Sequence, residues 1–117
     1  MKPVALVLLN SIFLAVLLTA SHGIMKWIAS NAHDGIAKAV MTHWFALGIA
    51  LCVYVFIFGY YLVALRIFHL SVLYPVYTGL SVLLVFVLGI AFFGEPVSNS
   101  KIFGGILVAL GVVLVAW

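Results

Sequence analysis

The sequence predicts an all-α membrane protein, a single domain of four transmembrane helices spanning residues 1–117. Of the 117 residues, 68% are hydrophobic and only 6% are charged. So few polar side chains cannot cover the surface of a water-soluble globule of this length. A hydrocarbon core of roughly 30 Å takes about 20 helical residues per crossing. Four crossings with short turns therefore use nearly the whole chain.

Four long apolar segments supply these crossings. Their unbroken Leu, Val and Phe runs exclude loops that face lipid, and the period-2 alternation of a membrane β-barrel is absent. The first segment is too long in its apolar core to be a signal peptide, so we interpret it as a membrane helix. The expected helices cover about residues 3–25, 40–65, 70–93 and 101–117.

The first helix has a face of small and polar residues that ends in a cation. Recurrence at helical spacing aligns Ser11, Ala15, Thr19, His22 and Lys26. This face is suited to lining the same cavity as the polar stripe of the third expected helix, described below. Lys26 equally suits a position where its ammonium group snorkels to the lipid headgroups.

The second helix contains the single cysteine, Cys52, which we expect to pack in the core as a small hydrophobe. The four histidines lie near expected helix ends without paired-ligand spacing, so no metal or other cofactor is expected. The sequence contains no nucleophile motif, phosphate-binding loop or carboxylate pair. We therefore predict that the protein is not an enzyme, and no nucleic acid is expected as a partner.

The third helix opens with "SVLYPVYTGLS", which is rich in polar atoms for a membrane segment. On a helix, one stripe holds Tyr74, Tyr77, Thr78, Ser81 and Val85. Hydroxyls in hydrocarbon need partners, so the stripe is expected to face other helices or a cavity. Interfacial tyrosines with ordinary small-residue packing are the alternative.

Proline and glycine in the same stretch have their own expected places. Pro75 is expected in the first turn, where its missing N–H costs little, and Gly79 on another face, where it permits close helix packing. After this helix, Glu95 precedes Pro96 in a polar turn, and we expect it to have a loop or helix-entry role.

The fourth helix carries Gly104, Gly105 and Gly111 in "KIFGGILVALGVVLV". Gly104 and Gly111 are seven residues apart, which makes a smooth groove for a partner helix. We expect these three glycines to form a dimer contact.

Charges are divided almost evenly between the two ends of such a bundle. Lys2 and Arg66 fall on one side, and the other side holds Lys26, Lys38 and Lys101 with the two acids. This is a weak positive-inside bias, so either insertion orientation is plausible and antiparallel pairing of identical chains is allowed. There are two alternatives: the small bias is still enough to fix a single orientation, or a partner subunit fixes the topology.

Four motifs together resemble the small multidrug resistance branch of the drug/metabolite transporter superfamily. They are "HGIMKWIAS", "LYPVYTGLS", "FFGEPVS" and "GGILVALGVVL". The resemblance implies a four-helix protomer that dimerises, often antiparallel, with helices one to three around a substrate chamber and helix four as the dimer contact. It also matches Lys26, Tyr74, Tyr77, Gly79, Gly104 and Gly111 to family positions for the helix-one lysine, the chamber aromatics and the packing glycines.

One departure from the family redirects the expected substrate. Proton-coupled drug exporters of this family carry a glutamate eight residues before the lysine, where this chain has Leu18. Leucine neither attracts a cation nor exchanges it for protons. "YP" in helix three and "EPVS" after "FFG" are similar to small subunits that flip aminoarabinose-modified undecaprenyl phosphate.

The expected function is therefore flipping of a lipid-linked sugar or prenyl phosphate across the inner (cytoplasmic) membrane. The expected partners are this lipid, membrane lipids, and a second copy or a paralogous four-helix subunit. The alternatives are an exporter of small hydrophobic or cationic compounds, and a non-transporting subunit of a heteromeric complex. The expected substrate-binding residues are Lys26, His22, Tyr74, Tyr77, Ser81 and Thr19.

Overall fold

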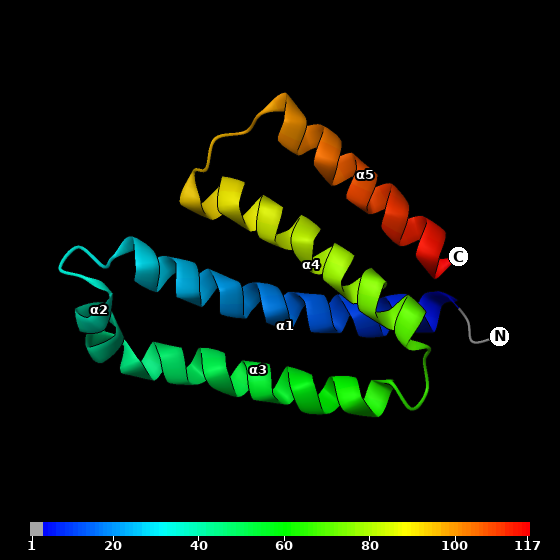
Figure 1. Cartoon of the computed structure of the whole chain (residues 1–117), viewed down its shortest axis with the longest axis horizontal. Helices are drawn as coiled ribbons and strands as arrows, with labels where there is room; N and C mark the ends of the chain where they lie inside the picture. Colours follow the sequence, from blue (N-terminus) through cyan, green and yellow to red (C-terminus); the bar gives the residue numbers. More distant parts are fainter. Residues whose placement is uncertain (1–3) are drawn as a thin grey trace.

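The computed structural model describes residues 4–117, which form five α-helices and no strand (Figure 1). Four of the helices are long and apolar enough to cross a bilayer, which confirms the four predicted crossings and a multi-pass membrane protein. The expected first helical residue and Lys2 lie outside the described residues. The helices are α1 (Val4–Ser30), α2 (Ile36–Thr42), α3 (Trp44–Ala64), α4 (Leu70–Phe93) and α5 (Asn99–Ala116).

The first helix ends later than predicted, at Ser30 rather than near residue 25. Polar side chains complete its last turn: the Ser30 hydroxyl donates to the Lys26 carbonyl at 2.8 Å, and the Asn31 amide donates to the Trp27 carbonyl at 2.8 Å. These side-chain bonds add to the backbone bonds of the last turn, since the Asn31 N–H also donates to the Trp27 carbonyl at 3.2 Å. Lys26 therefore belongs to the helix and not to the loop that follows it.

The second predicted helix begins later than expected, because residues 36–42 form the separate short helix α2. Gly35 precedes α2 with φ 104°, a conformation that favours glycine, and His43 interrupts the helical path before Trp44. Ile36 and Met41 are exposed on α2, while Lys38 pairs with Asp34 at 2.8 Å. Apolar and charged side chains on one short helix suit the surface of a bilayer.

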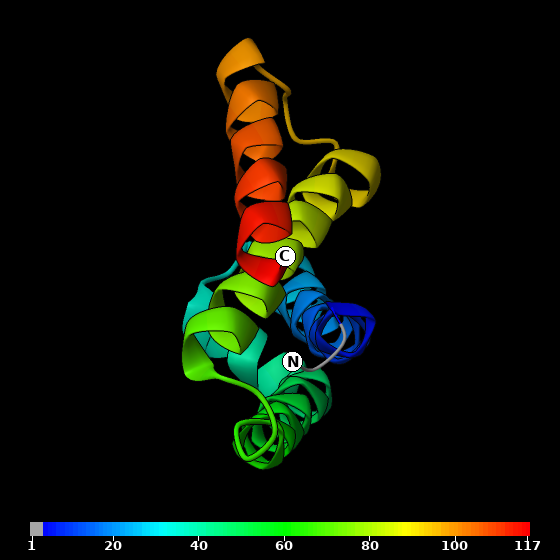
Figure 2. The ribbon, with the colours of Figure 1, turned by 90° about the vertical axis from the view of Figure 1, so that its right-hand side faces the viewer.

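The four long helices lie side by side in the order α3, α1, α4, α5 (Figures 1 and 2). Helix α1 packs against both α3 and α4, whereas α5 packs along α4 and meets α1 only slightly. The Cα trace measures 52 × 37 × 17 Å, so the protein is flat. Large apolar side chains such as Phe58 and Leu114 stay exposed on its faces, as expected for contact with lipid.

The buried core lies near one end, where the start of α1, the end of α3, the start of α4 and the end of α5 meet. A cluster of seven buried residues fills it: Val7, Ala64, Phe68, Leu73, Val76, Val112 and Ala116. Gly79 of α4 lies directly against Val112 of α5, with no room for a Cβ. The sequence predicted close backbone approach at Gly79, and the structure shows α5 as the helix that approaches.

Candidate functional site: an ion pair and a tyrosine groove

The polar face of α1 runs from the core toward the opposite end of the molecule. Ser11 and Ala15 are fully buried, His22 is half-buried and Lys26 is exposed. The Thr19 hydroxyl donates to the Ala15 carbonyl at 2.7 Å, so its hydrogen bond stays within α1. The face thus opens toward its charged end, and Thr19 cannot donate to a ligand without breaking that bond, although its oxygen remains free to accept one.

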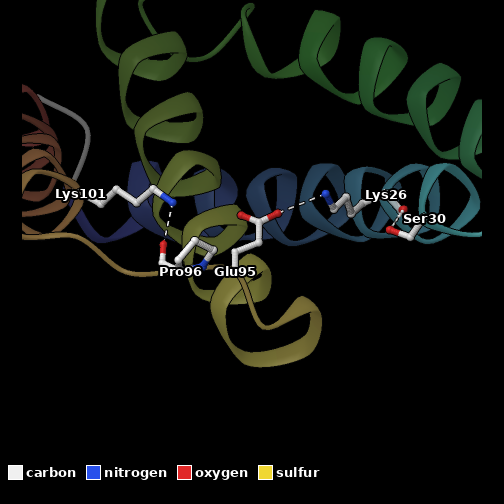
Figure 3. Close-up of polar contacts among 5 residues, drawn as sticks. All are labelled: Lys26, Ser30, Glu95, Pro96 and Lys101. Carbon is white, nitrogen blue, oxygen red and sulfur yellow. Dashed lines mark hydrogen bonds and ion pairs between the residues drawn. The ribbon is translucent and has the colours of Figure 1, made fainter.

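At this open end Lys26 forms an ion pair with Glu95 (Figure 3). The Lys26 Nζ lies 3.4 Å from the Glu95 Oε1, and about half of each side chain is exposed. Glu95 lies in the predicted turn but contacts α1, and Ser98, not Glu95, caps α5 by accepting a bond from the Lys101 N–H at 3.3 Å. Of the two roles expected for Glu95, helix entry belongs to Ser98, and Glu95 lies in the loop.

The turn that carries Glu95 is built by two glycines. Gly94 ends α4 with φ 61°, in the left-handed region that only glycine adopts readily. The Glu95 N–H then donates to the Gly89 carbonyl at 3.0 Å, which folds the chain back along α4. The Glu95 carboxylate rests against Gly89, where a Cβ would lie 2.8 Å from its Oε2.

A small cavity of about 200 Å³ lies between α1 and α4 beside this pair. Its polar lining comes from His22, Lys26 and Glu95, and its apolar lining from Val85, Leu88, Gly89 and Phe93. His22 and Lys26 share this cavity, whereas Tyr74 and Tyr77, which the sequence allowed to line the same cavity, do not line it. The cavity contains both basic groups of the α1 face and one acid from the α4–α5 turn.

A larger, apolar groove of about 530 Å³ lies between α1, α3 and α4. Tyr77 of α4 lines it together with Tyr54 and Tyr61 of α3 and Leu18 of α1. The Tyr77 ring centroid lies 5.4 Å from that of Tyr61 and 5.7 Å from that of Tyr74. Tyr74 itself is 51% exposed and does not line the groove. The aromatic rings of Tyr61, Tyr74 and Tyr77 therefore form a cluster at the edge of the groove, between α3 and α4.

The hydroxyls on the α4 stripe bond to their own helix. Ser81 is buried and donates to the Thr78 carbonyl at 2.8 Å, while Thr78 donates to the Tyr74 carbonyl at 2.6 Å. Pro75 lies in the second turn of α4, not the first, because α4 begins at Leu70. Its missing N–H therefore removes a bond from the helix interior.

Tyr54 connects the two sites and was missed in the sequence analysis. Its hydroxyl lies 3.5 Å from the His22 Nε2, and its ring lines the apolar groove. Tyr61 was missed too, although it lies seven residues after Tyr54 on the same helix face, the signal applied to the third helix. The buried Tyr61 hydroxyl has no hydrogen-bond partner among the described residues.

The glycines of α5 face different directions. At Gly104 and Gly111 nothing lies within 4 Å of an added Cβ, whereas Gly105 faces Phe86 and Leu83 of α4 in the same chain. Cys52 is exposed in α3, so the expectation that it packs in the core is wrong for a single chain. The backbone of helix α3 lies closest to that of α1, while Tyr61 also contacts Tyr77 of α4, and Cys52 is left uncovered.

No protein-family model, curated protein or solved structure matches the chain.

Proposed function

We propose that the protein is a membrane transporter that moves an amphipathic lipid with an anionic headgroup, such as a polyprenyl phosphate or its glycosylated form, across the inner membrane. The observation that supports it best is the cavity that His22 and Lys26 line, next to the tyrosine groove. A phosphate accepts charge-assisted hydrogen bonds from an ammonium or imidazolium group. The apolar groove alongside suits a hydrocarbon chain or the ring face of a sugar.

The distribution of acids favours an anion over a cation as the ligand. The four membrane-crossing helices contain no Asp or Glu in the described residues. Leu18, at the position of the family glutamate, lines the groove with three tyrosines. A cation in that groove has no carboxylate to neutralise it, and an uncompensated charge in a membrane interior is costly.

The flat shape favours function as a dimer. One chain is 17 Å thick and presents its grooves on an open face, so a single copy does not enclose a chamber. Pairing with a second copy or a paralogous subunit would close the groove against lipid. Alternating exposure to the two sides would then come from rocking of the paired subunits.

The test measures lipid binding to the purified protein in nanodiscs, using undecaprenyl phosphate as the ligand. Lys26→Ala should weaken binding roughly tenfold to a hundredfold, the effect of losing one charge-assisted hydrogen bond of about 1.5–3 kcal/mol. Lys26→Arg should restore part of the affinity, because it keeps the charge with a different geometry. Tyr77→Phe should have a smaller effect, since it keeps the ring and removes a neutral hydroxyl.

Lys101→Ala is the matched control. Lys101 lies at the same end of the molecule, but it donates to the Pro96 carbonyl at 2.7 Å and does not line the cavity (Figure 3). If lysines attract anionic lipids only in a general way, Lys26→Ala and Lys101→Ala should lower the affinity for undecaprenyl phosphate equally. The proposal fails if Lys26→Ala binds the phosphate as tightly as the parent, or if Lys101→Ala loses as much affinity as Lys26→Ala.

A further inference from the structure

We propose that Glu95 is a built-in competitor for Lys26, occupying the place that an anionic headgroup takes when it binds. This inference rests on the proposed function and adds its regulation: in the protein without ligand, Lys26 is already paired with the chain's own carboxylate. Anion binding then exchanges one anionic partner of Lys26 for another and releases the α4–α5 turn from α1.

The ion pair has the geometry of a contact that can exchange. Its atoms are 3.4 Å apart and the side chains are 50% and 42% exposed, so water reaches both partners. Exposed pairs of this kind are weak, because solvent screens them and two flexible side chains must be held in place. A ligand that brings two or three phosphate oxygens, together with hydrocarbon for the adjoining groove, can replace a single carboxylate.

The carboxylate is nonetheless placed by specific backbone features. The left-handed Gly94 turns the chain, and the Glu95 N–H bond to the Gly89 carbonyl fixes the direction of the turn. The absence of a side chain at Gly89 provides the surface on which the carboxylate rests. Glycine at 89 therefore permits Glu95 to lie against α4 and face Lys26.

The charges in the cavity disfavour binding of a phosphate while the Glu95 carboxylate is paired with Lys26. Lys26 and Glu95 together are neutral, and His22 is the other titratable group in the lining. The cavity has a volume of only about 200 Å³. A phosphate that entered it with Glu95 still in place would be repelled by the negative charge of the carboxylate. Binding is therefore favoured only when Glu95 leaves Lys26.

Two variants test the exchange by different routes. Glu95→Gln removes the competing charge and keeps the shape of the side chain. Gly89→Ala keeps every charge but places a methyl group 2.8 Å from the Glu95 Oε2, which obliges the flexible carboxylate to move away. Asp34→Asn is the control, because it removes the acid of the exposed Lys38 pair at the same end of the protein.

Affinities for undecaprenyl phosphate and for uncharged undecaprenol are measured in nanodiscs of neutral lipid. Glu95→Gln should bind the phosphate roughly two- to fivefold more tightly than the parent, matching release from a weak exposed ion pair. Gly89→Ala should change affinity in the same direction by less. Asp34→Asn should match the parent, and undecaprenol should bind all four proteins alike.

The two proposals fail on different results. If Glu95→Gln binds the phosphate no more tightly than the parent while Lys26→Ala still weakens binding, Glu95 is not a competitor and the transport proposal stands. Weaker binding by Glu95→Gln likewise overturns the competitor role, because the acid then supports the site. If Lys26→Ala binds like the parent, the proposed function itself is wrong.

Discussion

Leu18 lines the groove between α1, α3 and α4 together with Tyr54, Tyr61 and Tyr77. Aromatic faces attract cations, but in hydrocarbon a permanent cation also needs a formal negative charge nearby. The groove is therefore apolar and aromatic, but its lining carries no charge that would select a cation.

We predict that the parent protein moves no protons in response to quaternary ammonium compounds, and that Leu18→Glu gains binding of a lipophilic cation such as tetraphenylphosphonium. The new carboxylate would lie beside three tyrosine rings and supply the missing charge. Equilibrium binding of the labelled cation and proton release from proteoliposomes measure the two effects. Drug-driven proton movement by the parent would contradict the prediction.

Leu17→Glu is the control for Leu18→Glu. Leu17 is the neighbouring leucine, but it lines a separate apolar groove with Trp44, Phe45 and Cys52. Equal cation binding by both variants would show that any membrane carboxylate suffices, and that the tyrosine groove has no special role.

The hydrogen-bond and ion-pair partners of individual side chains were less predictable than the positions of the residues on the helices. Helical spacing put Ser81 and Thr19 on polar stripes, yet both hydroxyls bond to carbonyls of their own helix and neither residue lines the cavity or the tyrosine groove. Ser and Thr make such bonds whenever no better partner is near, and the sequence does not show which partner wins. The Lys26–Glu95 pair joins residues far apart in the chain, so no local spacing rule could have indicated it.

Among the elements, α5 has glycines on two faces, one that packs within the chain and one that is open. Gly105 faces α4 within the chain and Gly79 of α4 faces α5, so these two belong to the packing of one protomer. Gly104 and Gly111 face open space, which makes their side of α5 available to a partner helix.

We predict that Gly104→Leu and Gly111→Leu reduce crosslinked dimer in membranes without unfolding the protomer. Gly79→Leu should instead destabilise the protomer, because its side chain would overlap Val112 and force α4 and α5 apart. Crosslinking yield and thermal unfolding in detergent separate the two effects. Unchanged crosslinking in both α5 variants would show that this surface is not the dimer contact.

The elements themselves were largely predictable, since long apolar runs fix membrane crossings by composition alone. Their ends were not. Polar side chains at Ser30 and Asn31 extend α1 beyond the apolar run, and α2 was not foreseen because its seven residues merge with the apolar start of the next segment.

Over the whole molecule, charge differs little between the two ends. In the described residues one end holds Lys26, Lys38 and Lys101 with Asp34 and Glu95, and the other holds Arg66. Two of the three lysines are paired with the acids, so little net charge distinguishes this end from the other. The orientation rule counts basic residues near the ends of membrane helices and not net charge, and by sequence it sets three lysines against Lys2 and Arg66, so it is weakly satisfied here.

We predict that the parent inserts in both orientations, and that Lys38→Gln with Lys101→Gln shifts the population toward one in which the Arg66 end faces the cytoplasm. A cysteine introduced at Asn31, in a Cys52→Ala background, reports the orientation by its reaction with an impermeant thiol reagent. Labelling of the parent from one side only would contradict dual insertion. Lys26 is left intact, so the binding site is unchanged.

The order in which the helices pack has a consequence for biogenesis. As the chain leaves the ribosome, α3 arrives to find α1 already inserted, α4 then packs against α1, and α5 packs against α4. Each new segment thus meets a completed partner, and none has to wait in lipid for a later one. The Lys26–Glu95 contact forms only after α4 has turned at Gly94, so it is among the last long-range contacts to close during synthesis. A nascent chain arrested before Glu95 would present Lys26 unpaired to the lipid headgroups around it.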